Sequence, residues 1–288
     1  MAGVLEIRAF FDEPTNTVSY LIWDRDNREA AVVDPVLDWN NRNGTVDTRS
    51  ADAILAVAKE AGLAIRLVLE THAHADHLTA APYIKAHTGA RIGIGAHITD
   101  VQRIFRPVFN IDDLKPEGGD FDLLFQDGEP IALGGLEITV LHVPGHTPAD
   151  IAYRVADAVF VGDTIFMPDY GTARADFPGG DARALYRSIK RILSLPGETR
   201  LFMCHDYKAP GREAFAWETT VAEQRARNVH INDKIDEDAF VAMRTARDKT
   251  LSMPVLILPS IQVNLRAGQL PEPESNGVSY LKIPLNRL

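Results

Sequence analysis

The hydrophobic positions near the start of the chain form short apolar runs separated by polar turns. Apolar and β-branched residues dominate segments 17–23 and 29–36, which flank the polar stretch DRDNRE. This pattern predicts two strands of a hairpin. The next segment, residues 37–50, is rich in Asn and Asp, and we expect it to be a loop.

A helical pattern follows, and it leads into a further strand. Apolar residues recur every three or four positions in residues 51–61, with Ser50 as a plausible N-cap and Gly62 as a stop. The apolar run at 64–70 then predicts a buried strand, and residues 78–89 predict the next helix. The segment between the predicted strand and the predicted helix therefore directly follows the end of a strand.

The rest of the chain continues the alternation. Further strands are predicted at 91–96, 136–143, 150–156, 158–163 and 199–205, and further helices at 181–195, 212–228 and 236–248. Residues 103–122 are interrupted by Pro and Gly and predict a loop over the site, whose Phe105, Val108 and Phe109 line a pocket or enter the core. A Pro-rich segment, 258–277, follows the last helix. No repeat or linker divides the chain, which favours one catalytic domain over residues 1–288, with 210–288 as a helical and extended C-terminal segment packed on it.

Composition narrows the class of protein. With 45% hydrophobic and 24% charged residues, the chain can bury a sizeable core. Its formal charge of −10 disfavours nucleic-acid binding. No apolar run suits a signal peptide or a membrane span, and the single cysteine, Cys204, cannot form an intramolecular disulfide. We therefore expect a cytoplasmic protein, in which Cys204 is a buried strand thiol rather than a reactive one.

Chemistry is concentrated in the stretch LETHAHADHLTAAPYI. His72, His74, Asp76 and His77 occur within six positions, directly after an apolar run. In extended backbone, residues two apart point to the same side, as do His72, His74 and Asp76, and His77 follows at the start of the next predicted helix, so the four side chains can surround one small volume. Imidazole and carboxylate groups are ligands for divalent iron, zinc or manganese. The stretch therefore predicts a metal site.

Three later polar residues also follow predicted strands. They are His146 in VPGHTPAD, Asp163 in FVGDTIF and His205 in FMCHDY. An unpaired carboxylate at the end of a buried strand is costly, so we expect Asp163 to face a cation. The isolated histidines are instead interpreted as hydrogen-bonded core or surface residues: His87, His97, His142 and His230.

Together, HAHADH, PGHT, GD and the late His resemble the metallo-β-lactamase superfamily. The resemblance implies an α/β fold, a four-layer αββα sandwich with the metal at the sheet edge. Most members are zinc hydrolases, and their two-metal site would use His72, His74 and His146 on one side, Asp76, His77 and His205 on the other, and Asp163 as a bridge. Such a site activates water and polarises a carbonyl, which allows a thioesterase of the hydroxyacylglutathione hydrolase (glyoxalase II) type or a lactonase.

Other segments are more similar to the persulfide dioxygenase (sulfur dioxygenase) branch, including its bacterial group with an extended C-terminus. These segments are PGHTPADIAY, GTARADFPGGDARALYRSI, CHDY and NLRAG. The resemblance implies one Fe(II) per subunit, held by His72, His146 and Asp163. It also implies that glutathione persulfide, O2 and water give sulfite and glutathione, redox chemistry that zinc lacks.

The remaining four polar residues of the cluster would orient ligands and water around the iron or mark a vacant second metal position: His74, Asp76, His77 and His205. For the substrate, the resemblance indicates Arg174, with Tyr207 and Arg225 as further candidates. A salt bridge to Asp176 is an equal alternative for Arg174. A homodimer or higher homo-oligomer and a pathway link to a sulfurtransferase are compatible with this branch.

Among rival functions, the dinuclear zinc thioesterase or lactonase is the leading one. A flavodiiron oxygen reductase is disfavoured, because that pattern has Glu where this chain has His74. A non-enzymatic scaffold is disfavoured by the intact ligand set. Departures from shorter family members at 37–48, 208–218 and 271–286 bear on thiol specificity and subunit contacts.

Overall fold

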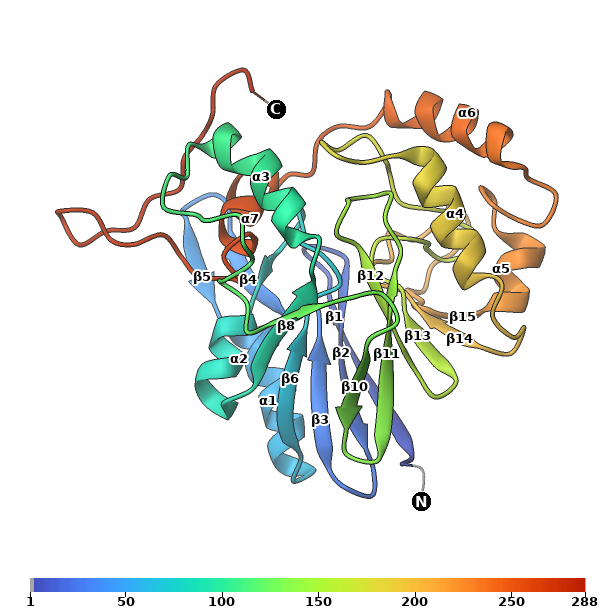
Figure 1. Ribbon diagram of the computed structural model, residues 1–288, viewed down its shortest axis with the longest axis horizontal. Coiled ribbons are helices and arrows are strands. Elements are labelled where there is room, and N and C mark those ends of the chain that lie inside the picture. Colours follow the sequence, from blue (N-terminus) through green and yellow to red (C-terminus); the bar gives the residue numbers. More distant parts are fainter. Residues whose placement is uncertain (1–2, 288) are drawn as a thin grey trace.

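The central strands are apolar on both faces, and this explains the layers of the molecule. In β6 (Ala64–Leu69), Leu67 and Leu69 face one core, Val68 faces another, and all three are buried. Such a strand must lie between two layers. The structure, a computed structural model that describes residues 3–287, has two six-stranded sheets in the middle and helices on both outer sides (Figure 1). The predicted four-layer αββα sandwich is confirmed.

Both large sheets are mixed. The first has the order β1 (Leu5–Asp12), β2 (Thr17–Asp24), β3 (Glu29–Val33), β6, β8 (Arg91–Gly95) and β9 (Leu123–Phe125). The second has the order β10 (Pro130–Leu133), β11 (Leu136–His142), β12 (Ile151–Val155), β13 (Ala158–Phe160), β14 (Arg200–Phe202) and β15 (Glu218–Thr220). A small third sheet has the order β5 (Thr45–Asp47), β4 (Val36–Asn40) and β7 (Leu78–Thr79).

Each outer face is covered by helices with an apolar side. The first sheet is covered by α1 (Arg49–Glu60), α2 (Ala81–Thr88), α3 (Ile98–Phe109) and α7 (Ile257–Asn264). The second is covered by α4 (Ala182–Ile192), α5 (Val221–Arg227) and α6 (Glu237–Asp248). None of the helices in the described part of the chain is both long and apolar enough to span a membrane.

Strand direction brings distant loops to one edge of the two sheets. Strands β3, β6 and β8 are parallel, so the segments that follow them leave the same edge. The start of β12 is joined to the segment after β6 by a 3.0 Å hydrogen bond from the amide of Ile151 to the carbonyl of Thr71. In the same way, the amide of Val18 donates to the carbonyl of Cys204 at 2.7 Å. Residues after β6, β11, β13 and β14 therefore converge.

Two of the predicted loops contain regular structure. Residues 37–50 include the β4–β5 hairpin, because β4 also pairs with β7 and only the turn between the hairpin strands is irregular. Residues 103–122 begin inside α3, whose Pro107 lies in the last turn, so one i→i−4 hydrogen bond is lost and the helix ends two residues later, at Phe109. Phe105 and Phe109 are buried in the core beneath α3.

Three predicted helical or terminal segments also differ from the structure. Residues 212–228 form a helix only from Val221, after the short strand β15. Helix α1 begins at Arg49 rather than after Ser50, whose hydroxyl donates to Asp38 at 3.0 Å. The Pro-rich segment 258–277 contains most of α7, a buried helix with Pro259 in its first turn, a position that tolerates proline.

Candidate metal centre

The motif loop, residues 70–77, follows β6 and carries the HAHADH sequence. Its backbone is fixed from the far end of the chain: the Asn264 side chain on α7 donates to the carbonyls of His74 and His77, both at 2.8 Å. From the other side, Asp34 accepts the amide of Thr71 at 2.7 Å. These contacts hold the histidines at the sheet edge.

The sequence-predicted ligands converge at this edge, and two of the overlapping groups of ligand atoms there together contain all seven of them. Within each group the ligand atoms all lie within 4.8 Å of one another. One group is His72, His146 and Asp163, and the other is His74, Asp76, His77 and His205.

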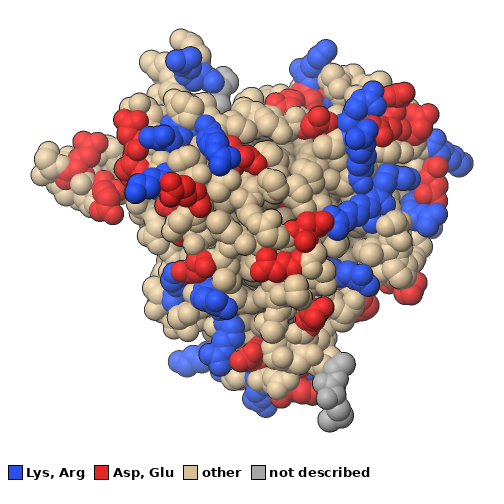
Figure 2. Space-filling view, viewed as in Figure 1, with Lys and Arg blue, Asp and Glu red and all other residues tan. Residues whose placement is uncertain are grey.

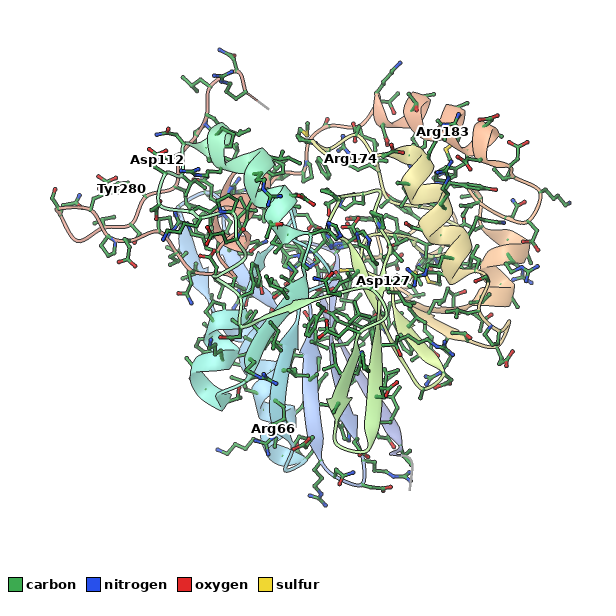
Figure 3. All side chains as sticks on the ribbon, viewed as in Figure 1. Arg66, Asp112, Asp127, Arg174, Arg183 and Tyr280 are labelled. Carbon is green, nitrogen blue, oxygen red and sulfur yellow. The ribbon has the colours of Figure 1, made fainter. Side chains whose placement is uncertain are left out.

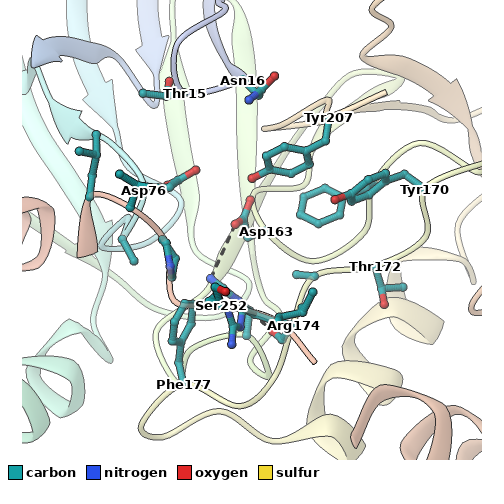
Figure 4. A pocket seen from close by; sticks show the side chains of 18 of the residues that line it. Thr15, Asn16, Asp76, Asp163, Tyr170, Thr172, Arg174, Phe177, Tyr207 and Ser252 are labelled. Atoms are coloured by element: carbon teal, nitrogen blue, oxygen red, sulfur yellow. Dashed lines mark hydrogen bonds and ion pairs between the residues drawn. The ribbon is translucent and has the colours of Figure 1, made fainter. Parts of the chain in front are cut away.

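Asp163 lies between the two groups. Its Oδ2 is 3.9 Å from Nε2 of His72 and 3.7 Å from Nε2 of His146. Its Oδ1 is 3.3 Å from Nε2 of His205, which in turn lies 3.0 Å from Oδ2 of Asp76. Figure 4 shows the carboxylates of Asp76 and Asp163 directed into the same cavity. One carboxylate can thus contact either group or both.

Hydrogen bonds to the outer ring nitrogens define which atoms of His72 and His146 can bind a metal. Nδ1 of His146 lies 2.9 Å from the carbonyl oxygen of Arg174, which can only accept. The Thr71 hydroxyl donates to Asp34 at 2.9 Å, so it accepts from Nδ1 of His72 at 3.0 Å. Both Nδ1 atoms therefore carry the proton, and both Nε2 atoms present a lone pair on the side of Asp163.

Several buried polar atoms in the cluster have no hydrogen-bond partner in the structure. They are Nε2 of His72, His77 and His205, both ring nitrogens of His74, Oδ2 of Asp76 and Oδ1 of Asp163. Such a concentration of unpaired ligand atoms would be costly without a cation. Imidazole nitrogens with carboxylate oxygens fit divalent iron, zinc or manganese.

The protonation states of the cluster suit metal binding. Burial, together with the neighbouring histidines, lowers the pKa of His72 and of His74 well below the ordinary value, so both imidazoles are neutral. Burial raises the pKa of Asp163, although His205 and His146 oppose the effect. For Asp76 burial acts in the same direction, but the charge of His205, the hydrogen bond and charge of His77 and the charge of His74 together outweigh it, and the pKa is lowered.

Residues outside the motifs complete the site, and the sequence patterns did not indicate them. Asp34 follows β3, is buried, and lies with Oδ1 3.0 Å from Nε2 of His74. Burial raises the pKa of Asp34 to about 6. The signal available in the sequence was an aspartate directly after an apolar strand, the same pattern that singled out Asp163. Thr71 and Asn264 had no such signal, because their roles depend on long-range contacts.

A cavity of about 510 Å³ opens onto the cluster. Asp76, His146 and Asp163 line it, together with Tyr207 and Arg174, two of the predicted substrate residues. Figure 4 shows Tyr207 and Arg174 on different sides of Asp163. The cavity is continued by residues 251–256, the segment between α6 and α7.

Arg174 has the predicted salt bridge and also lines the cavity. Its guanidinium donates to both carboxylate oxygens of Asp176, at 2.6 and 2.8 Å, and to the carbonyl of Ser252 at 2.7 Å. Its Cζ also lies 4.8 Å from the ring centre of Phe177. In Figure 3 Arg174 lies near the chain that follows α6. The two interpretations of Arg174 are therefore compatible.

Arg225 lies outside the cavity lining, unlike the other two predicted substrate residues. It is on the outer side of α5, half exposed, and pairs with Asp233 at 3.1 Å. The buried side of this short helix carries Val221 and Gln224, which leaves Arg225 directed away from the core. Figure 2 shows acidic and basic side chains interspersed over the face in view, without one broad basic area.

The remaining single residues agree with their structural interpretations. The ring of His97 stacks on that of His142, with centroids 4.5 Å apart, and His87 contacts the carbonyl of Tyr83. His230 accepts the amide of Thr172 at 3.1 Å. Cys204 is buried, and burial raises the pKa of its thiol well above the ordinary value, so the prediction of a buried thiol is confirmed.

Comparison with known proteins adds the family context. The profile of the metallo-β-lactamase superfamily matches residues 12–205. A probable metallo-hydrolase of Burkholderia pseudomallei (strain 1710b) is 54% identical over 295 residues, which cover 99% of this chain and 100% of that protein. A β-lactamase hydrolase-like protein of Xylella fastidiosa (strain Temecula1) is 51% identical over 98% of this chain, but this chain spans only 65% of that protein.

Two differently named activities occur among further relatives. Glyoxylase B2 of Dictyostelium discoideum is 45% identical, over 100% of this chain and 99% of that protein. The mitochondrial persulfide dioxygenase ETHE1 of Homo sapiens is 29% identical, over 91% of this chain and 88% of that protein. The crystal structure of ETHE1 from Myxococcus xanthus has a TM-score of 0.73 and 29% identity, and the match covers 92% of this chain and 100% of that one.

Proposed function

The chain belongs to the metallo-β-lactamase superfamily, and from this premise we propose that it is an iron(II)-dependent persulfide dioxygenase. The proposed reaction oxidises glutathione persulfide with O2 and water to sulfite and glutathione. Similarity to the human and Myxococcus proteins named ETHE1 supports this choice. One Fe(II) per subunit is the proposed cofactor.

The grouping of the ligand atoms is the observation that carries the proposal. Two imidazoles and one carboxylate, from His72, His146 and Asp163, form one group, and Asp163 also lies in a group with Cys204 and His205. His74, which a dinuclear zinc site would use beside His72, belongs to a different group, and its Nε2 lies 3.0 Å from Oδ1 of the buried Asp34. A set of two His and one carboxylate is typical of non-haem iron oxygenases.

Each of these three residues has a defined part in the proposed reaction. A ferrous ion held by them would leave coordination positions for a thiol sulfur and for O2. Thr71 and the carbonyl of Arg174 retain the protons on Nδ1 of His72 and His146, so that Nε2 of each ring stays free to bind.

The cavity residues bind the substrate and limit the access of water. Phe166 and Phe177, both nearly buried, supply apolar walls. Tyr207 lines the same cavity, and its neutral hydroxyl can donate a hydrogen bond to the persulfide substrate. Asp76 and His205 lie beside Asp163 and can orient water.

Metal analysis combined with an oxygen electrode tests the proposal. Protein purified without oxygen is expected to contain one iron per chain and to consume O2 only when glutathione persulfide is added. Sulfite should appear in the same amount as the O2 consumed. Protein with two zinc ions, no oxygen uptake and rapid cleavage of a glutathione thioester would contradict it.

A dinuclear zinc thioesterase is the second candidate. It is favoured by the identity to glyoxylase B2, which extends over the whole chain, and by the position of Asp163 between the two ligand groups. In that case His74 would leave Asp34 and bind the first metal with His72 and His146. The thioester assay on zinc-loaded and iron-loaded protein separates the two candidates.

A further inference from the structure

Three arginines line the cavity, and two of them are already paired with carboxylates. Arg174 donates to both oxygens of Asp176. Arg244 is buried on α6, and its Nε and Nη2 lie 2.8 and 2.5 Å from Oδ1 of Asp248. Arg247, one turn further along the same helix, is exposed and forms no ion pair with any residue between 3 and 287. Its guanidinium is available to a ligand.

The charge of Arg247 acts on the cavity side of α6. Burial raises the pKa of Tyr170, another lining residue, while Arg247 and Arg244 oppose that rise. Burial, together with the charges of the same two arginines, lowers the pKa of His230 to about 4. The positive charge is therefore felt by groups around the cavity.

The acidic residues of the lining do not neutralise Arg247. They are Asp76 and Asp163, and both belong to the candidate metal cluster, where a divalent cation would balance their charge. With the other two arginines paired, the wall formed by α6 keeps an excess positive charge. A ligand in this cavity is favoured if it carries a negative group opposite α6.

We propose that Arg247 binds a carboxylate of the thiol substrate and thereby selects acidic thiols such as glutathione over neutral ones. This inference takes the identity of the substrate, a thiol related to glutathione, from the proposed function. It does not depend on the proposed reaction. The wall that contains Arg247 lies outside residues 12–205, the part of the chain that matches the family profile. A basic residue in the last turn of a helix also stabilises the helix dipole, so the test must measure ligand charge and not stability.

Calorimetric titration of anaerobic, metal-loaded protein with glutathione and with its dimethyl ester provides that test. The native protein should bind glutathione at least about tenfold more tightly than the ester, the difference of one charge-assisted hydrogen bond. Arg247→Gln should bring this ratio close to one, and Arg247→Lys should restore part of it. Lys249→Gln, which removes an exposed charge two residues away and outside the cavity lining, should retain the native ratio.

The outcomes separate this inference from the proposed function. An unchanged ratio in Arg247→Gln, an equal loss of affinity for both ligands, or no preference for glutathione in the native protein would overturn it. Binding needs no turnover. Suppose that Arg247→Gln removes the preference for glutathione over the ester, while the native protein consumes no O2 with glutathione persulfide. The role of Arg247 would then stand, and the proposed dioxygenase activity would be wrong.

Discussion

His146 donates its Nδ1 proton to the main-chain carbonyl of Arg174, and the two atoms lie 2.9 Å apart. The side chain of the same arginine extends to Asp176 and to the carbonyl of Ser252. Residue 174 thus orients a candidate metal ligand through its backbone and holds the cavity wall through its side chain. Substitution of the side chain leaves the carbonyl in place, so the two effects can be measured separately.

Arg174→Gln is expected to raise the KM for glutathione persulfide by about tenfold, because it removes the ion pair with Asp176 and loosens residues 251–256. Metal content should not change, since the bond to His146 persists. Steady-state oxygen uptake and metal analysis on the same preparation measure both. Loss of metal in parallel with activity would contradict the separation of roles.

Asp163→Ala should abolish iron binding and oxygen uptake, because it removes the carboxylate from the group formed with His72 and His146. Replacement of His77 or His205 by Ala should leave iron bound, since neither belongs to that group. Iron per chain, measured after anaerobic purification, decides the point. Equal iron loss in all three variants would favour a dinuclear centre.

Thr71→Val should weaken metal binding by about 10- to 100-fold, the usual effect of losing a hydrogen bond that orients a metal-binding histidine. The Thr71 hydroxyl joins Asp34 to Nδ1 of His72, and valine cannot replace it. Thr71→Ser is the matched control, because it keeps the hydroxyl. Competition with a chelator gives the affinities, and a Val variant that binds as tightly as the Ser variant would refute the role.

Asp150 should make the metal-free protein less stable as the pH rises towards neutrality. Burial raises its pKa to about 7 from an ordinary value of 3.8, although Thr147 donates to both carboxylate oxygens. A raised carboxyl pKa means that the folded state binds the proton more tightly, so the stabilisation is complete below about pH 4 and is lost as the pH approaches 7.

The Asp150→Asn variant cannot titrate at this position. The free energy of unfolding of the native protein, minus that of the variant, should therefore fall between pH 4 and pH 7. Urea titrations across this range measure the difference. A difference that is constant with pH, or that grows as the pH rises, would show that burial does not raise the pKa of Asp150.

Local patterns in the sequence predicted most of the fold, because the central strands are apolar and lie between turns. They failed where tertiary contacts decide the conformation. Strand β1 was not singled out, since only its pairing with β2 sets it apart. Helix α7 was hidden in a Pro-rich segment, because a buried helix has no polar face to give it periodicity. Helix α3 was missed, and its second half was predicted to be part of a loop, because Pro107 and the Pro and Gly residues that follow are typical of irregular segments.

For the candidate site, the sequence indicated the polar residues that converge but not those that hold them. His72, His146 and Asp163 each follow a strand, which is a local signal. Asn264 contacts the motif loop across 187 and 190 residues of sequence, and no local pattern reveals such a contact. The division of the ligands into two groups also depends on distances in space.

The contacts of Asn264 have a consequence for the order of events during synthesis of the protein. The motif loop leaves the ribosome long before the residue that fixes its carbonyls, which is made 187 residues after His77. Until then the loop lacks one of its two anchors, and its histidines are not yet held at the sheet edge. Selective loading should therefore occur after translation, when the last helix has docked on the first sheet.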